Sequence, residues 1–367
     1  MIRSFDWRDV GLVKTLADRG VCLDSETGLT QGNHPLQQAL LAYLMPMAGP
    51  PTLIWRGDGP DAEGAARGRE RAAASATAPP ATAPGAPASV IFGQLRHRLG
   101  EEFARILYVA PVSAEDSAGW LPLLERLIIE AGERRAQNLL ADVNEKSSAY
   151  EALREAGFAI YARQSLWKLA PGAALALAAE PAPMRAATRG DVIAVSTLYS
   201  NIVPRLVQQV EPGPSRIERG YVLEHGGELV AYLDVRRGPQ GIWVEPFLHP
   251  EAYDLSEAVL HACLQLLAPS RKEKPLYICI RRYQDWLQDV VARVGFEALG
   301  SQAVMVKRLV ARVTEPLLKP LPVVDGQRPT PITSAHFQVR EDERPAEQWS
   351  RRSTNYRWRK HAKTNHR

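Results

Sequence analysis

The sequence predicts an α/β protein in which one unit, a mixed and mostly antiparallel sheet flanked by helices, is built twice in tandem. The chain has 367 residues, which exceeds one ordinary core and suits two domains with connectors. Three landmarks also recur in the same order along the chain: Arg3 with Asp9 and Arg185 with Asp191, Val109-Ala110-Pro111 and Val244-Glu245-Pro246, and Gly157-Phe158 and Gly295-Phe296. An ordered set that appears twice indicates a duplicated unit.

Each copy begins with a short helix followed by antiparallel strands. Asp9 and Asp191 each precede an apolar segment of helical period, as an N-cap residue would. In the second copy the strand-like runs YVLE and LVAYLDV flank His225-Gly226-Gly227, which predicts a tight hairpin.

The first copy carries an insertion where the second has this turn. Residues 72–89 contain only Ala, Ser, Thr, Pro and Gly, a composition that cannot bury enough apolar surface to offset chain entropy. We therefore expect a disordered insertion over about residues 57–89.

After Val-x-Pro each copy reads helix, buried strand, helix, strand. The buried strands are NLLADV and LYICI, and Gly-Phe ends the second helix of each copy with a glycine suited to the left-handed conformation. Ser148 with Glu151, and Asp254 with Glu257, are spaced to cap helices.

Composition divides the chain into four parts. We expect a first domain over 1–169, an Ala/Pro-rich linker over 170–183, a second domain over 184–310 and an extended basic tail over 311–367.

This element order, with Arg-x5-Asp at the start, Val-x-Pro ending the central strand and Gly-Phe closing the last helix, resembles the GNAT superfamily of acyl-CoA-dependent N-acyltransferases. The resemblance covers about residues 2–169 and 184–309. It implies two central parallel strands that splay apart, with acetyl-CoA or another acyl-CoA between them. It also implies that the pyrophosphate binds at the N-terminus of the helix after Val-x-Pro, where free N–H groups and the helix dipole attract anions.

The resemblance implies cofactor contacts at Tyr108, Val109, Ser117, Ala118, Gly119 and Val244. The sequence departs from the family at the pyrophosphate loop, Arg-Gly-x-Gly-x-Gly/Ala. The first copy has Glu115-Asp116-Ser117-Ala118-Gly119-Trp120 there, with one glycine and two acids, and the second copy has no glycine or cation over 249–259. Acidic side chains near a phosphate weaken its binding.

Three residues are candidates for proton transfer. Glu245, on the central strand of the second copy, is placed to act through water as a general base that deprotonates an amine. Tyr150 and Tyr283 are candidate acids for the departing thiolate, although the positions where the family often has tyrosine hold Arg154 and Val291. The alternative interpretation is a half-exposed strand glutamate and two structural tyrosines.

Most of the excess positive charge lies in the tail. Residues 351–367 hold seven Lys/Arg and no acid, interleaved with Tyr356 and Trp358, which leaves 38 basic and 41 acidic residues elsewhere. Such a segment is able to bind nucleic acid phosphates and stack on bases, and the alternative is a disordered solubilising end.

Other protein classes find no support in the sequence. It has no long uncharged apolar run and no signal-peptide pattern, so we expect a cytoplasmic protein without a membrane segment. Three scattered cysteines and eight dispersed histidines predict no metal site. Two functions remain open: acyl transfer from acyl-CoA to the amine of a small molecule or protein, or a catalytically degenerate GNAT-fold binding or scaffold protein.

Overall fold

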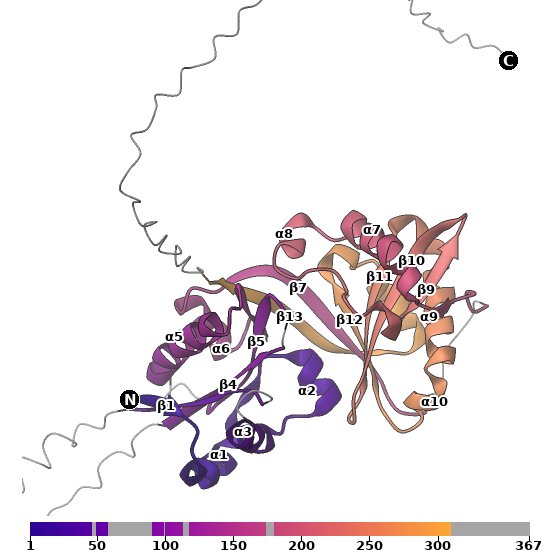
Figure 1. Ribbon diagram of the computed structural model, residues 1–367. Helices are drawn as coiled ribbons and strands as arrows, with labels where there is room; N and C mark the ends of the chain where they lie inside the picture. Colours follow the sequence, from indigo (N-terminus) through magenta and orange to yellow (C-terminus); the bar gives the residue numbers. More distant parts are fainter. Residues whose placement is uncertain (46–48, 58–89, 99, 113–116, 174–179, 310–367) are drawn as a thin grey trace, which may run out of the picture. The chain divides into compact units, whose positions relative to one another are not determined.

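The strands of both copies join in one mixed sheet with helices on its faces (Figure 1). In this computed structural model the strand order is β1-β3-β4-β5-β6-β13-β7-β12-β11-β10-β9-β8, and β2 pairs with β5 beside this path. The structure describes residues 1–45, 49–57, 90–98, 100–112, 117–173 and 180–309. Three predicted segments lie outside these residues: the insertion apart from residue 57, residues 174–179 of the linker, and the whole basic tail over 311–367. The predicted mixed α/β fold is confirmed.

The first copy contains β1 (Ile2–Ser4), η1 (Trp7–Asp9), α1 (Val10–Leu16), η2 (Ala17–Arg19), β2 (Val21–Cys22), α2 (Ser25–Gln31), α3 (Pro35–Leu44), β3 (Thr52–Arg56), β4 (Val90–His97), β5 (Phe103–Ala110), α5 (Ser117–Glu133), β6 (Asn138–Val143), α6 (Ser148–Glu155) and β7 (Ala159–Leu169).

The second copy contains β8 (Arg185–Ala186), η4 (Arg189–Asp191), α7 (Val192–Ile202), α8 (Arg205–Gln208), η5 (Ile217–Arg219), β9 (Tyr221–His225), β10 (Glu228–Arg237), β11 (Ile242–Leu248), η6 (Pro250–Leu255), α9 (Ser256–Leu266), α10 (Ala268–Arg271), β12 (Leu276–Arg281), η7 (Arg282–Gln284), α11 (Leu287–Val294) and β13 (Glu297–Arg308).

The Arg-x5-Asp landmark is the same ion pair in both copies. Arg3 binds both carboxylate oxygens of Asp9 at 2.5 and 2.6 Å, and Arg185 binds those of Asp191 at 2.7 and 2.8 Å. Each aspartate also accepts the backbone N–H three residues before it, which completes a capping box on the first turn. The landmark therefore fixes the first strand of each copy to the start of its helix.

The Gly-Phe landmark is also repeated in detail. Gly157 has φ +80° and Gly295 has φ +109°, the left-handed region that glycine adopts without a Cβ penalty. The following N–H groups close the helix ends in the same way, from Phe158 to the carbonyl of Leu153 at 3.0 Å and from Phe296 to that of Val291 at 3.2 Å.

Two predicted helix caps are wrong. α6 begins at Ser148, so its N-cap is Ser147, whose hydroxyl donates to the carbonyl of Asn144. α9 begins at Ser256 because a 3-10 helix, η6, precedes it and contains Asp254. α6 thus begins one residue earlier than the predicted cap requires, and α9 begins one residue later.

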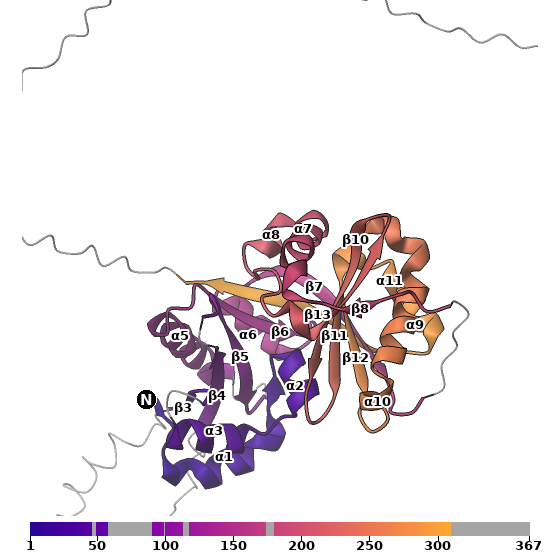
Figure 2. The same cartoon turned by 45° about the vertical axis from the view of Figure 1, so that its right-hand side comes forward.

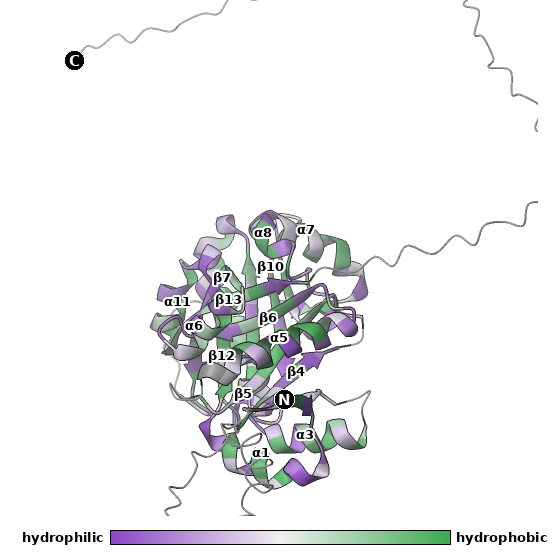
Figure 3. Ribbon diagram, turned by 90° about the vertical axis from the view of Figure 1, so that its left-hand side faces the viewer, coloured by the Kyte–Doolittle hydropathy of each residue, from purple (hydrophilic) through white to green (hydrophobic). Residues whose placement is uncertain are grey.

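The apolar residues form layers on both faces of the sheet. In the first half α5 and α6 pack on one face, and residues of α1 and α3 cover the other. α9 and α11 cover one face of the second half, and α7 packs on the other. Figure 3 shows green and purple residues along both α1 and α3, as expected for helices with one buried face.

The last strand of each copy lies in the middle of the shared sheet. β7, from the first copy, pairs with β12 of the second, and β13, from the second copy, pairs with β6 of the first. β7 and β13 also pair with each other, antiparallel (Figures 1 and 2). The two copies thus exchange their final strands, which the sequence analysis did not anticipate.

Candidate functional site

The central parallel strands separate in both copies. β5 and β6 pair only from Phe103 to Arg105, and β11 and β12 pair only from Ile242 to Val244. Beyond those residues the strand edges of each pair diverge. This is the splayed arrangement that the resemblance implied, and it occurs twice.

In the first copy the chain itself fills the gap between the separated strands. Val21 and Cys22 of β2 pair with β5, and the N–H of Leu23 donates to the carbonyl of Leu107 at 2.9 Å. The carbonyl of Leu23 accepts the N–H of Asp142 on β6 at 2.8 Å. Leu23 thus bridges both strand edges and occupies the space between them that a ligand would need.

In the second copy a side chain covers the equivalent edge. The side-chain amide of Gln284 donates to the carbonyl of Pro246 and accepts the N–H of Leu248, both at 2.9 Å. Gln284 is buried at 2% exposure. Here one side-chain amide, rather than a strand, makes the hydrogen bonds of the β11 backbone where β11 and β12 separate.

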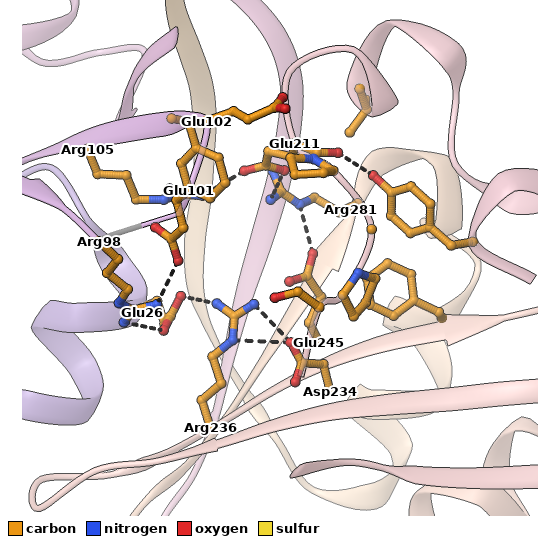
Figure 4. A pocket seen from close by; sticks show the side chains of 18 of the residues that line it. Glu26, Arg98, Glu101, Glu102, Arg105, Glu211, Asp234, Arg236, Glu245 and Arg281 are labelled. Carbon is orange, nitrogen blue, oxygen red and sulfur yellow. Dashed lines mark hydrogen bonds and ion pairs between the residues drawn. The ribbon is translucent and has the colours of Figure 1, made fainter. Parts of the chain in front are cut away.

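A charged cavity of about 330 Å³ lies between the two copies beside this second gap. Its walls come from β4, β5 and α2 of the first copy and from β10, β11, β12 and the segment after α8 in the second. Six arginines and six acidic residues line it, and Figure 4 labels ten of these and marks contacts between them. They are Arg96, Arg98, Arg105, Arg219, Arg236, Arg281, Glu26, Glu101, Glu102, Glu211, Asp234 and Glu245.

One row of ion pairs crosses the cavity from the first copy to the second. Glu211 accepts from Arg105 at 2.6 Å and from Arg281 at 2.8 Å, and Arg281 also binds Glu245 at 3.2 Å. Burial opposes ionisation of Glu211, but Arg281 and Arg105 outweigh it and lower its pKa to about 2.

Glu245 responds differently to the same surroundings. Burial raises the pKa of the Glu245 carboxyl above its ordinary value, against the opposing effect of Arg281 and Arg236. A carboxylate whose pKa is raised toward neutrality is a better proton acceptor than an ordinary glutamate.

A second set of ion pairs lies nearer to the first copy. Arg236 binds Glu26 on α2 and reaches Asp234 at 2.9 Å. Arg98 approaches the same Glu26 only to 3.9 Å and Glu101 to 3.5 Å. Glu26 therefore serves two arginines, one from each copy.

Two of the three predicted catalytic residues meet at this cavity. Glu245 on β11 and Tyr283 on η7 both line it. Burial raises the pKa of the Tyr283 hydroxyl, with Arg281 acting against the shift. Tyr150 does not join them: it packs against the core of the first copy on α6, with the guanidinium of Arg154 5.8 Å from its ring centroid.

The predicted cofactor contacts lie apart from the cavity. Tyr108 and Val109 are hydrogen-bonded to β4 on one side and to β2 on the other, while Val244 is fully buried and ends the pairing with β12. Ser117 and Ala118 open α5, and the structure does not describe their side chains.

Gly119 has a packing role. A Cβ at this position would lie 2.4 Å from the Trp55 ring and 2.5 Å from Ile91. The glycine lets α5 approach β3 and β4 closely, so close packing explains this glycine without a role in phosphate binding.

Sequence reasoning missed Glu211 and all six arginines at the cavity. Arg105 and Arg281 gave a usable signal, because each stands in or ends an otherwise apolar strand and a buried charge requires a partner. Glu211 lies in a Pro/Gly-rich segment with no periodicity, and nothing local distinguishes it.

The element order and the two separated strand pairs give the chain a GNAT-type fold, built twice. Solved structures similar to it include a GCN5-related N-acetyltransferase from Sphaerobacter thermophilus, with 11% identity, 84% of this chain and 95% of that chain covered, and a TM-score of 0.49. A tandem GNAT protein from the clavulanic acid biosynthesis pathway has 14% identity, 84% and 98% coverage and a TM-score of 0.47. A GCN5-related N-acetyltransferase from Kribbella flavida has 19% identity, 59% and 86% coverage and a TM-score of 0.41.

No family model matches the sequence, and no curated protein matches it significantly. Within the described part of the chain, no helix combines the length and apolar character that a membrane span requires. Across the same residues no group of three His, Cys, Asp or Glu could hold a metal ion. Nucleic-acid binding by residues 351–367, which lie outside the described residues, stays a prediction.

Proposed function

We propose that the protein transfers an acyl group from acetyl-CoA or another acyl-CoA to an amine, and that the second copy provides the reaction centre. The observation that carries this proposal is that Glu245 and Tyr283 line one cavity beside the gap between β11 and β12. We place the reaction centre in the second copy rather than the first because Leu23 bridges the separated strands of the first.

The residues at the cavity supply the proton transfers that this reaction needs. Glu245 accepts a proton from the ammonium or the attacking amine, directly or through one water. The amine nitrogen forms the new bond to the thioester carbonyl carbon, and the carbon–sulfur bond breaks. Tyr283 donates its proton to the departing thiolate. Arg281, bound to Glu245, fixes the direction of that carboxylate.

The thioester substrate fits the second copy only if Gln284 yields its two hydrogen bonds. The amides of the pantetheine arm could then take the positions that the Gln284 amide holds on Pro246 and Leu248. This exchange replaces one amide by another, so few buried backbone groups would be left without a partner.

The same covered edges favour a second candidate function. A chain whose two strand gaps are satisfied by its own residues, and whose two phosphate loops keep only Gly119 of the family's glycines, suits a binding protein that has lost acyl-CoA. In that function the cavity between the copies would hold a ligand without acyl transfer.

Titration calorimetry with acetyl-CoA and longer acyl-CoAs, followed by an assay of thiol release with a mixture of amines, separates the two functions. Acyl transfer requires that the chain bind acyl-CoA and release CoA. The control Glu151→Gln, on the surface of α6, should leave both unchanged. Glu245→Gln and Tyr283→Phe should each slow release, and Tyr150→Phe tests the other predicted acid. If millimolar acyl-CoA does not bind, acyl transfer is ruled out and the second candidate function, a protein that binds another ligand, remains.

A further inference from the structure

From the cavity we infer the class of the acceptor: a small amine that also carries an anionic group, a carboxylate or a phosphate. The amine would face Glu245, and the anion would bind the arginine wall, defined here as Arg96, Arg98 and Arg236. This inference rests on the proposed function and specifies its acceptor.

The arginine wall has donors to spare. Asp24 binds Nε and Nη2 of Arg96 at 2.9 and 2.6 Å, but Nη1 of Arg96 is buried and has no partner among the described residues. Within the described ranges the Arg98 side chain, which is 41% exposed, makes two long contacts, to Glu26 at 3.9 Å and to Glu101 at 3.5 Å. A planar guanidinium with free N–H groups suits a carboxylate or phosphate.

The three cations also crowd one another. Partial burial and the neighbouring charge of Arg96, with a further contribution from Arg236, lower the pKa of Arg98. A bound anion at this place would relieve that repulsion as well as accept the free donors.

The opposite side of the cavity suits the amine. Figure 4 shows Arg98 and Glu245 on different sides of the view, with Arg236 between them. Glu245 is the carboxylate whose pKa is raised, and Tyr283 lines the same cavity. A cavity of about 330 Å³ is at the lower end of the range for small-molecule sites, which limits the acceptor to a metabolite-sized compound.

This arrangement gives the first copy a role. Its own strand gap is filled, yet β4 supplies Arg96, the residue after β4 is Arg98, and α2 supplies Glu26, all three at the cavity. The first copy would recognise the acceptor and the second would carry out the reaction.

Binding of matched pairs of small amines to the full chain tests the inference without any acyl-CoA. The pairs are amino acids with their carboxamides, and phosphoethanolamine with ethanolamine, and calorimetry measures each affinity. We expect one anionic class to bind at least about tenfold more tightly than its neutral counterpart, as loss of a charged hydrogen bond implies. The pair that shows the preference identifies carboxylate or phosphate as the anion.

Arg98→Gln should abolish this preference, whereas Arg98→Lys, which keeps the charge, should retain most of it. Arg163→Gln is the matched control, because Arg163 is 42% exposed, is paired with Glu145 and does not line the cavity. Thermal unfolding checks that each variant is folded.

Equal binding of charged and neutral partners, an unchanged preference in Arg98→Gln, or no binding of any anionic amine at millimolar concentration would overturn the inference. Thiol release separates it from the proposed function. Release with neutral amines alone removes the anionic acceptor and keeps acyl transfer. Preferential binding of the anionic amine without release removes acyl transfer and keeps the anion site.

Discussion

The side-chain amide of Gln284 lies 2.9 Å from the carbonyl oxygen of Pro246, and this contact covers the strand edge that an acyl-CoA would need. Gln284→Ala uncovers it. The variant should lose about 1–3 kcal/mol of unfolding free energy, because the Pro246 carbonyl and the Leu248 N–H lose their partner.

The same variant should bind acetyl-CoA more tightly than the natural chain if the second gap is the acyl-CoA site. Calorimetry and chemical unfolding measure the two effects separately. A loss of stability with no gain in affinity would show that acyl-CoA does not use the β11 edge. Gln288→Ala is the control, because this residue of α11 donates its side-chain amide to Asp285 on the surface and is not at the β11 edge.

The pH dependence of acyl transfer should report Glu245. Its folded pKa is raised, and only the ionised form accepts a proton, so the rate should rise as the pH increases through that pKa and then level off. Glu245→Gln should lower the rate by about 100-fold or more and remove this rise. An identical pH profile in the variant would assign the titration to another group.

Stability in acid should depend on Glu211. Its pKa falls from an ordinary 4.5 to about 2 in the folded chain, so its contribution is complete above pH 4.5 and is lost as the pH falls toward 2. This shift corresponds to roughly 3 kcal/mol at neutral pH. Urea unfolding at several pH values measures the effect.

Glu211→Gln should flatten this acid dependence and cost about 3–5 kcal/mol at pH 7, because Arg105 and Arg281 then lose a shared buried partner. Asp24, whose pKa is also about 2, leaves some acid dependence in the variant. An unchanged stability at pH 7 would mean that the ion pairs across the cavity do not hold the copies together.

Alanine substitutions at two glycines of α5 test whether Gly119 has a packing role. Gly119→Ala should cost about 1–3 kcal/mol, since its Cβ would meet the Trp55 ring. Gly132→Ala has no atom within 4 Å of the added Cβ and should be neutral or stabilising by about 0.5–1 kcal/mol. Equal effects in thermal unfolding would contradict the packing role of Gly119.

The duplicated fold could be predicted because its signals are local. Three of these features depend on residues a few positions apart, and all three are present in the structure: the Arg3–Asp9 pair, the left-handed Gly157 and the turn at Gly226 and Gly227. β9 and β10 occupy the two predicted runs on either side of that turn.

The site was only partly predictable because it depends on long-range contacts. Glu245 and Tyr283 were identified from the resemblance, and the structure brings them to one cavity. The partners of Glu211 lie 106 and 70 residues away, and the Leu23 bridge joins strands that no local pattern connects. The strand exchange was missed for the same reason. The sequences of β7 and β13 predict a strand in each case but do not indicate which strand each one pairs with.

The position of β13 has a consequence for how this chain is made. The edge of β6 that faces away from β5 pairs with Ala303–Arg308, so until the ribosome has produced those residues this edge of buried, mostly apolar residues has no partner strand. Such an edge invites pairing with other nascent chains. Synthesis of the first half therefore ends long before its part of the sheet is complete. We expect a chaperone to bind the first half during that interval.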